Sequence, residues 1–173
     1  GCTVVISQLF GAGQIKEMKT TVFTALIALG AIGLAIMALG ELTSLPLLRL
    51  LGTNEEIMGD SLVYLRIYFG GAVFLFLYNT LNGIYNALGD SNTPLKFLMV
   101  SALTNIGLDL LFVIRFHMGV AGVAWATLIA QGMCAVFSFY ILMKRLAKME
   151  NEERYEEEKP ALFELSAAKR SAR

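Results

Sequence analysis

Asp109 is the residue of this sequence whose position is hardest to explain by packing alone. It is the single charged residue between Phe97 and Ile114, and a carboxylate within an apolar membrane segment is costly unless it is paired, protonated or hydrated. Asn105 lies four residues earlier, so both side chains project from one face of a helix. Carboxylate and carboxamide oxygens suit Na⁺, and a buried carboxylate can instead carry a proton. The pair predicts a cation-binding site, with a purely structural Asp as the alternative.

A third oxygen ligand can come from Thr127, in the next apolar stretch. Thr127 and Gln131 share one helix face, and the Thr127 hydroxyl lies beside Asp109 if the two segments form a helical hairpin. Small residues from Gly119 to Ala126 permit close approach of the two helices. A bond from the Thr127 hydroxyl back to a carbonyl of its own helix is the alternative.

Polar side chains also recur along the uncharged run 67–89. Tyr78, Asn82 and Asn86 follow one another at intervals of four residues, so they form one stripe on a helix. Such groups face protein or a watery cavity rather than lipid. Two interpretations stay open. The stripe, together with Gln131, lines a substrate path, or it is a seam of hydrogen bonds between helices.

Composition and missing motifs exclude several classes of protein. The 173 residues carry 14 Lys+Arg and 14 Asp+Glu, and only 16% are charged, against about 25% in an average soluble domain. This balance excludes a disordered chain and a nucleic-acid binder that relies on bulk positive charge. No Walker loop or dinucleotide fingerprint is present, and Cys2 and Cys134 lack the spacing of a zinc or redox pair. The sequence predicts a protein that is not an enzyme and needs no cofactor.

Long uncharged runs indicate a polytopic membrane protein. The runs 20–40, 67–89 and 118–143 contain 21, 23 and 26 residues, and each can cross a hydrocarbon core about 30 Å thick as a helix. The stretch around Asp109 predicts a fourth crossing. We therefore expect an all-α transmembrane bundle of four full helices and the end of a fifth, near residues 1–10, 20–46, 62–88, 95–115 and 120–146.

The distribution of Lys and Arg predicts the orientation. Six basic residues fall at alternate helix ends on one face, against three on the other, which puts the loops near residues 11–19 and 89–94 in the cytoplasm of a plasma-membrane protein. The first part of residues 149–173 is highly charged. These residues are expected to form a cytoplasmic tail or inter-lobe linker, helical as far as about Pro160. Because the first apolar run is too short to cross a membrane, we expect the sequence to be a fragment.

Four motifs in order resemble the N-terminal half of multidrug and toxic compound extrusion (MATE) transporters. They are Ile6-Ser7-Gln8-x-x-Gly11-Ala12, Leu88-Gly89-Asp90-Ser91-x-Thr93-Pro94, Asn105-Ile-x-Leu-Asp109 and Gly119-Val-x-Gly122-x-Ala124-x-Ala126-Thr127. The resemblance runs over residues 1–148. It implies helices two (end only) to six of a fold with twelve helices in two lobes.

The resemblance also implies a function and a site. It implies an antiporter, coupled to Na⁺ or H⁺, that exports bulky and often cationic drugs across the bilayer. Asn105, Asp109 and Thr127 match the cation-binding positions of the family, which uses a further Asp on a first helix. That helix and the C-terminal lobe would be the partners of this segment. A lipid-linked oligosaccharide or polysaccharide flippase of similar architecture, and a non-transporting membrane remnant or scaffold, are the alternatives.

Overall fold

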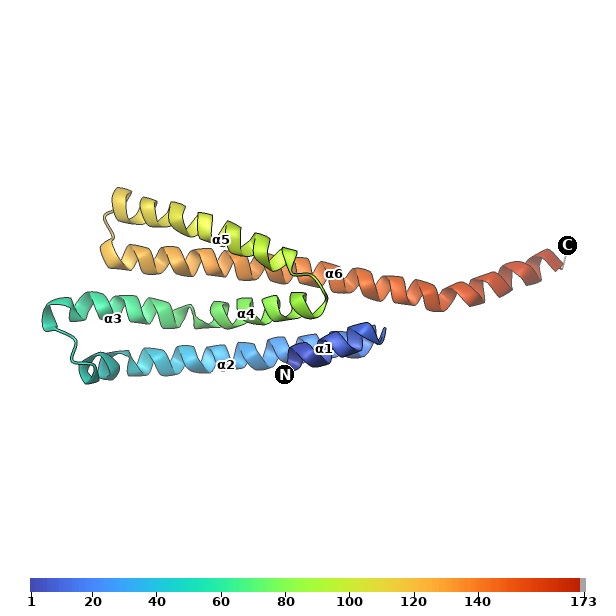
Figure 1. The fold of residues 1–173 in the computed structure, drawn as a ribbon, viewed down its shortest axis with the longest axis horizontal. Coiled ribbons are helices and arrows are strands. Elements are labelled where there is room, and N and C mark those ends of the chain that lie inside the picture. The colour runs from blue at the N-terminus through green and yellow to red at the C-terminus, as the bar shows by residue number, and fades with distance from the viewer. Residues whose placement is uncertain (172–173) are drawn as a thin grey trace.

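The computed structural model describes the backbone of residues 1–171 and the side chains of residues 1–156. Throughout the described part the regular structure is helical, which confirms the predicted all-α class. Figure 1 shows long helices lying side by side and joined by short turns. The elements are α1 (Cys2–Gly11), α2 (Ile15–Leu50), α3 (Glu55–Gly70), α4 (Ala72–Ala87), α5 (Asn92–Leu110), the π-helix η1 (Leu111–Arg115) and α6 (Gly119–Ser171).

Several of these helices are long and apolar enough to cross a membrane. α2 and α6 meet this criterion alone, and α5 meets it together with η1, which continues it. A fourth crossing is obtained if α3 and α4 are one bent span. The four predicted crossings thus correspond to three long helices and one bent pair among the described residues.

The single helix predicted near residues 62–88 is wrong in two respects. It begins earlier, at Glu55, because Asn54 caps it and accepts a hydrogen bond on Oδ1 from the backbone N–H of Glu56 at 3.3 Å. It is also broken at Gly71, where α3 and α4 meet at a bend of 43°. Gly71 follows another glycine, and sharp helix bends without proline commonly occur at such small residues.

The last helix is longer than predicted. A helix near 120–146 and a tail that stops being helical near Pro160 are expected from the sequence, but α6 runs from Gly119 to Ser171. A proline removes one backbone N–H and bends a helix without always ending it. Figure 1 shows α6 leaving the bundle and bending toward its red end. Residues 149–171 therefore continue α6 rather than follow it.

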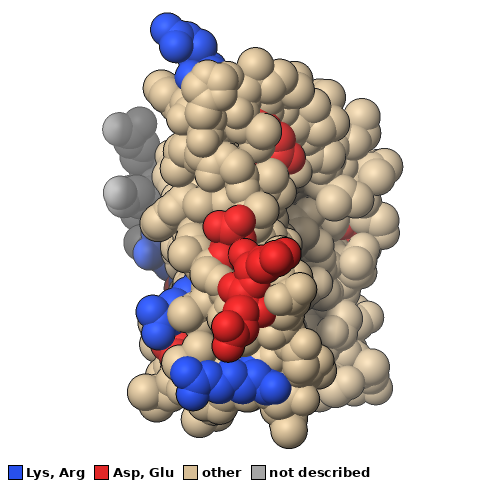
Figure 2. Space-filling model, turned by 90° about the vertical axis from the view of Figure 1, so that its left-hand side faces the viewer, with Lys and Arg blue, Asp and Glu red and all other residues tan. Residues whose placement is uncertain are grey.

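The turns lie at two opposite ends of the bundle. Turns 12–14 and 88–91 lie at the end that we call the α4–α5 end, on the right of Figure 1. Turns 51–54 and 116–118 lie at the α2–α3 end, on the left. The loops near residues 11–19 and 89–94, predicted to share one side of the membrane, therefore do lie at one end of the molecule. Figure 2 views the opposite, α2–α3 end and shows acidic side chains gathered across its middle, with Lys and Arg nearer its edges.

The buried hydrophobic cluster lies where α1, α2, α4 and α6 meet, toward the α4–α5 end. α5 packs mainly on α6 and contributes one fully buried residue, Pro94. Complete burial of a large apolar side chain stabilises the fold of a soluble protein by about 1.5–3 kcal/mol. In lipid, the close packing of the helices supplies the attraction between them instead. The buried cluster consists of Ile6, Met18, Val22, Leu26, Leu81, Ile84, Tyr85, Ala87, Leu88, Leu142 and Leu146.

Gly40 allows α2 and α3 to approach closely. The ring of Phe69 on α3 already occupies the position that a Cβ on Gly40 would take. Gly40 is buried, and Ser44, one turn later, is also buried and donates its hydroxyl hydrogen to the Gly40 carbonyl. A glycine is required here because every other residue would carry a carbon atom into the ring.

Polar contacts tie α6 to the rest of the bundle at the α4–α5 end. Asp90 accepts hydrogen bonds from the Thr93 N–H at 3.0 Å and the Thr93 hydroxyl at 2.7 Å, which caps the start of α5. Arg145 on α6 donates to Asp90 Oδ2 at 2.6 Å. Tyr85 donates its hydroxyl hydrogen to the Ser138 carbonyl at 2.8 Å. The α4–α5 turn is thus held to α6 at two levels.

Asp90→Asn is expected to lower the free energy of unfolding by about 1 kcal/mol at pH 7. The hydrogen bonds from Thr93, together with the Arg145 guanidinium, hold the pKa of Asp90 below its usual value. A carboxyl group with a lowered pKa stabilises the fold above its unfolded pKa of about 3.9, and this contribution is lost as the pH falls through the folded pKa. Melting temperatures of wild type and variant in detergent should therefore differ at pH 7, approach each other as the pH falls below the unfolded pKa, and converge below the folded pKa.

The matched control for this prediction is Asp60→Asn. Asp60 is an exposed carboxylate on α3, so its substitution should leave the melting temperature unchanged at both pH values. A difference between wild type and Asp90→Asn that is as large in acid as at pH 7 would contradict the role given to the Asp90 carboxylate.

Candidate functional site

Asp109 is the second-to-last residue of α5, and Leu110 alone separates it from the π-helical turn η1. There Phe116 donates its backbone N–H to the Leu111 carbonyl, five residues back, at 3.1 Å. Turns of this kind occur often at functional sites, because they shift the register of the side chains beyond them. Asp109 is half-buried, and its Oδ1 atom is fully buried with no hydrogen-bond partner among the described residues. An orphaned buried carboxylate oxygen is rare in proteins and points to a ligand or proton.

Asn105 and Thr127 meet across the α5–α6 hairpin. The Asn105 amide nitrogen donates to Thr127 Oγ1 at 3.3 Å, and the Thr127 hydroxyl donates to the Val123 carbonyl at 3.0 Å. The bond within α6, given as the alternative for Thr127, is thus made, and the hairpin brings the Thr127 hydroxyl to Asn105; its place beside Asp109 stays a prediction. The Asn105 amide nitrogen is used on Thr127, so its carboxamide oxygen is the group that can coordinate a cation. No described hydrogen bond joins Asp109 to either residue.

Thr127 also borders a small recess on the other side of α6, against α3. Gln131 shares this recess, whose other walls include Tyr64, Tyr68 and Gly71. The rings of Tyr64 and Tyr68 stack with centroids 6.3 Å apart. The sequence interpretation missed these tyrosines as neighbours of Thr127. Their spacing of four residues was the available signal, but it does not reveal which helix they face.

The polar stripe on α4 makes no hydrogen bond between helices among the described residues, which argues against one of its two interpretations, the interhelical seam. The hydroxyl of Tyr78 and Oδ1 of Asn82 are buried, yet neither has a hydrogen-bond partner among the described residues. Asn86 is exposed. The side-chain bond from α4 to α6 is made instead by Tyr85. Lining of a substrate path by Tyr78, Asn82 and Asn86, with Gln131, stays a prediction.

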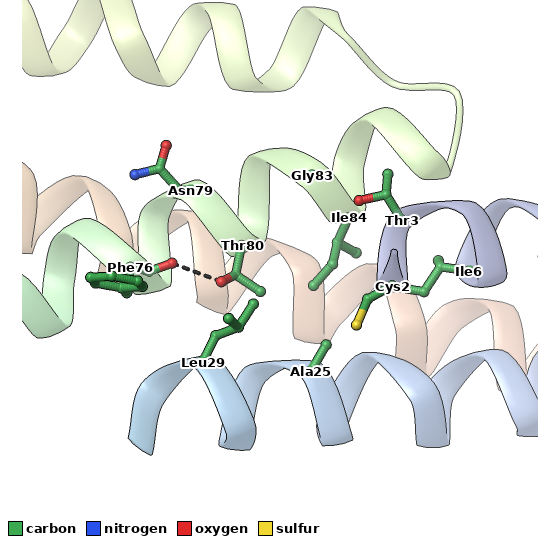
Figure 3. Close-up of a pocket in the computed structure, with 10 residues that line it drawn as sticks. All are labelled: Cys2, Thr3, Ile6, Ala25, Leu29, Phe76, Asn79, Thr80, Gly83 and Ile84. Atoms are coloured by element: carbon green, nitrogen blue, oxygen red, sulfur yellow. Dashed lines mark hydrogen bonds between the residues drawn. The ribbon is translucent and has the colours of Figure 1, made fainter. Parts of the chain in front are cut away.

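A separate apolar cavity lies between α1, α2 and α4. It has a volume of about 230 Å³, and Figure 3 shows Leu29, Ala25 and Ile84 around it, with Asn79 pointing away on the far side of the α4 ribbon. Thr80 on its wall bonds to the carbonyl of Phe76 in its own helix, at 2.7 Å. None of the predicted site residues lines this cavity. It is a packing groove between helices rather than the candidate site.

The donor set around Asp109 suits an alkali cation or a proton. Among the described residues no three His, Cys, Asp or Glu side chains lie close enough to hold a metal ion together. One carboxylate with neutral carboxamide and hydroxyl oxygens is the kind of ligand set that hard cations accept. Binding of either ion at the orphaned Oδ1 of Asp109 stays a prediction.

Comparison with known proteins decides the family. A family model named MatE matches residues 1–111 of the sequence. This chain belongs to the MatE family. The resemblance inferred from the four motifs is therefore confirmed, and members of this family are transporters, not enzymes.

Relatives of this MatE chain bear the names of transporters. It is 36% identical to the probable multidrug resistance protein YpnP of Bacillus subtilis over 143 residues, which are 82% of this chain and 32% of that protein. It is 26% identical over 147 residues to the FAD transporter of Shewanella oneidensis, covering 83% of this chain and 32% of the other.

Solved structures agree with the fold of this MatE chain. An inward-facing multidrug resistance MATE family transporter of the MOP superfamily matches with a TM-score of 0.78 and 27% identity, over 82% of this chain and 32% of that one. An outward-facing structure of such a transporter gives a TM-score of 0.77 over the same shares. The chain thus spans about a third of the length of the proteins that it matches.

Proposed function

We propose that this chain is part of a MatE exporter that couples the inward movement of Na⁺ or H⁺ to the outward movement of bulky, often cationic compounds. Matched proteins named for multidrug resistance support this substrate class. Because the chain spans about a third of their length, the activity is proposed for the full gene product. In it, a first helix, a second lobe and the plasma membrane would surround this segment, with the α4–α5 end in the cytoplasm.

The single observation that carries the coupling proposal is the orphaned Oδ1 atom of Asp109, buried one helical turn from the Asn105–Thr127 contact. A carboxylate left in this state within a membrane helix is unfavourable. Binding a proton or Na⁺ relieves that cost, so the site has affinity for either ion.

The cation can bias the conformation of the transporter through charge. When Asp109 binds H⁺ or Na⁺, the net charge at the α5–α6 hairpin changes by one unit. The free energy of carrying that charge differs between a conformation that exposes Asp109 to water and one that buries Asp109. The ion therefore favours one conformation over the other, and release of drug accompanies the shift.

The flippase alternative is not supported by the charge pattern. Substrates of such proteins carry phosphate, which Arg and Lys bind well. The uncharged runs 20–40, 67–89 and 118–143 contain neither residue. A scaffold without transport would not need the orphaned Asp109 carboxylate.

Transport by the purified full gene product in proteoliposomes tests the proposed function. We expect uptake of ethidium, a planar organic cation, when an outwardly directed Na⁺ or H⁺ gradient is imposed. Monensin should abolish a Na⁺-driven signal and nigericin an H⁺-driven one, because each dissipates its gradient. Protein-free liposomes give the background rate. Rates at background under both gradients, or a rate that does not change when the gradient is dissipated, would refute cation-coupled export.

A further inference from the structure

The bend between α3 and α4 is bridged by hydrogen bonds on both sides. The N–H of Gly71 donates to the carbonyls of Ile67 at 3.0 Å and Tyr68 at 3.1 Å, and Leu75 donates to the Gly71 carbonyl at 3.1 Å. The chain thus turns through 43° at one glycine while its backbone bonds continue past that residue. A shared donor and a residue without a side chain make this point easier to bend than the rest of the span.

The two helices that meet at the bend are held to the bundle unequally. α4 contributes Leu81, Ile84 and Tyr85 to the buried cluster, and Tyr85 is also bonded to α6. None of the described side chains of α3 is fully buried. A helix with few buried contacts moves at a lower free-energy cost than one in the core. α4 is therefore the fixed side of the bend and α3 the side that can move.

One turn of α6 touches both the bend and the candidate cation site. A Cβ placed on Gly71 would lie 2.7 Å from Cδ1 of Leu128, so Leu128 packs directly on the bend. The preceding residue, Thr127, accepts the hydrogen bond of Asn105. A displacement of this turn by ion binding would therefore reach the bend through a single side chain.

We propose that Gly71 is a hinge about which α3 swings against α4, and that Leu128 transmits displacements of Thr127 to this hinge. The proposal rests on the proposed cation coupling at Asp109 and adds the element that moves. The swing opens or closes the recess in which Tyr64 and Tyr68 face Thr127 and Gln131. The state of the cation site thereby sets the position of the α2–α3 end of α3.

Distances between two spin labels in the full gene product test the hinge. The labels are placed through Glu56→Cys on α3 and Met118→Cys before α6, both exposed, with Cys2 and Cys134 replaced by alanine. The 16 residues of α3 form an arm of about 24 Å, so a swing of about 10° moves its tip by about 4 Å. Asp109→Asn supplies the uncharged state of the site. We expect the most populated distance to differ by up to about that amount between wild type and Asp109→Asn.

Variants at the contact decide whether Leu128 transmits the change. Leu128→Ala should leave α3 in one position whether residue 109 is Asp or Asn. Gly71→Ala should shift the distance, because its Cβ meets Leu128, and Leu128→Ala should reverse that shift. Gly70→Ala is the matched control, since the nearest atom to its Cβ outside its own helix turn is Glu41 Oε1 at 4.0 Å. It should leave the distance unchanged.

Efflux measured on the same protein separates the two proposals. Gradient-driven efflux with equal distances in wild type and Asp109→Asn, or a full shift that persists in Leu128→Ala, overturns the hinge and leaves the function standing. No efflux in wild type overturns the function. The hinge is then judged on Gly71→Ala alone. A shift of the spin-label distance that Leu128→Ala reverses supports the hinge, and an unchanged distance in Gly71→Ala overturns it. If Gly71→Ala does not fold, the Leu128→Ala comparison decides.

Discussion

Asp109→Asn in the full gene product is expected to abolish gradient-driven drug efflux while the protein still inserts and folds. Asparagine keeps the size of the side chain and one carbonyl oxygen, but it cannot take up a proton and carries no charge to attract Na⁺. Coupling of one ion to a conformational change is commonly worth about 1–3 kcal/mol, or roughly 5–150-fold. We therefore expect the coupled rate to fall by at least about tenfold. The measurement is ethidium transport in proteoliposomes at equal amounts of folded protein.

Two further variants make this result specific to the buried carboxylate. Asp60→Asn removes a carboxylate that is exposed on α3 and should leave the transport rate unchanged. Thr127→Val removes the hydroxyl that accepts the Asn105 hydrogen bond, and a smaller loss than that of Asp109→Asn is expected because the charge is retained. Wild-type rates in Asp109→Asn would show that the ion is bound elsewhere.

The second large effect is expected from Gly40→Val, which should prevent α2 and α3 from packing. The new side chain would occupy the space of the Phe69 ring, and Gly40 is itself buried on α2. Overpacking of a core typically costs about 1–3 kcal/mol and more where the neighbours are rigid. We expect a large loss of monodisperse protein in size-exclusion chromatography and a lower melting temperature in the fraction that remains.

Gly30→Val is the matched control for this prediction. Gly30 lies in the same helix, but a Cβ added there would meet no atom of the described residues within 4 Å. Both substitutions change helix propensity equally, so the difference between them measures the contact with Phe69. Equal yields and melting temperatures for the two variants would contradict the close approach of α2 and α3.

The membrane helices and the candidate site differ in how much of them the sequence predicts. Uncharged runs mark the crossings because a charge in lipid is costly, and this signal is local and strong. The common face of Asn105 and Asp109 follows from helical periodicity alone. The α5–α6 hairpin also follows, because two helices joined by a short turn are antiparallel neighbours.

Contacts between distant segments could not be predicted from the sequence. The pairing of Asp90 with Arg145 joins residues 55 positions apart, and no local pattern specifies such a partner. The break at Gly71 has a local signal in its two glycines, but glycine is tolerated in straight membrane helices as well. The contact of Tyr64 and Tyr68 with Thr127 depends on the direction of that bend, so this part of the site could not be predicted from the sequence.

The α5–α6 hairpin has a consequence for the order in which the protein assembles. Its defining hydrogen bond joins Asn105 and Thr127, which are 22 positions apart, whereas Tyr85 and Ser138 are 53 apart. Contacts between near neighbours in the chain form fast, because little chain entropy is lost in closing the loop. The hairpin needs only α5 and the first part of α6, so it can form during synthesis before the later turns of α6 have left the ribosome. The Asn105–Thr127 contact is then present from an early stage of synthesis, and the rest of the bundle closes around it.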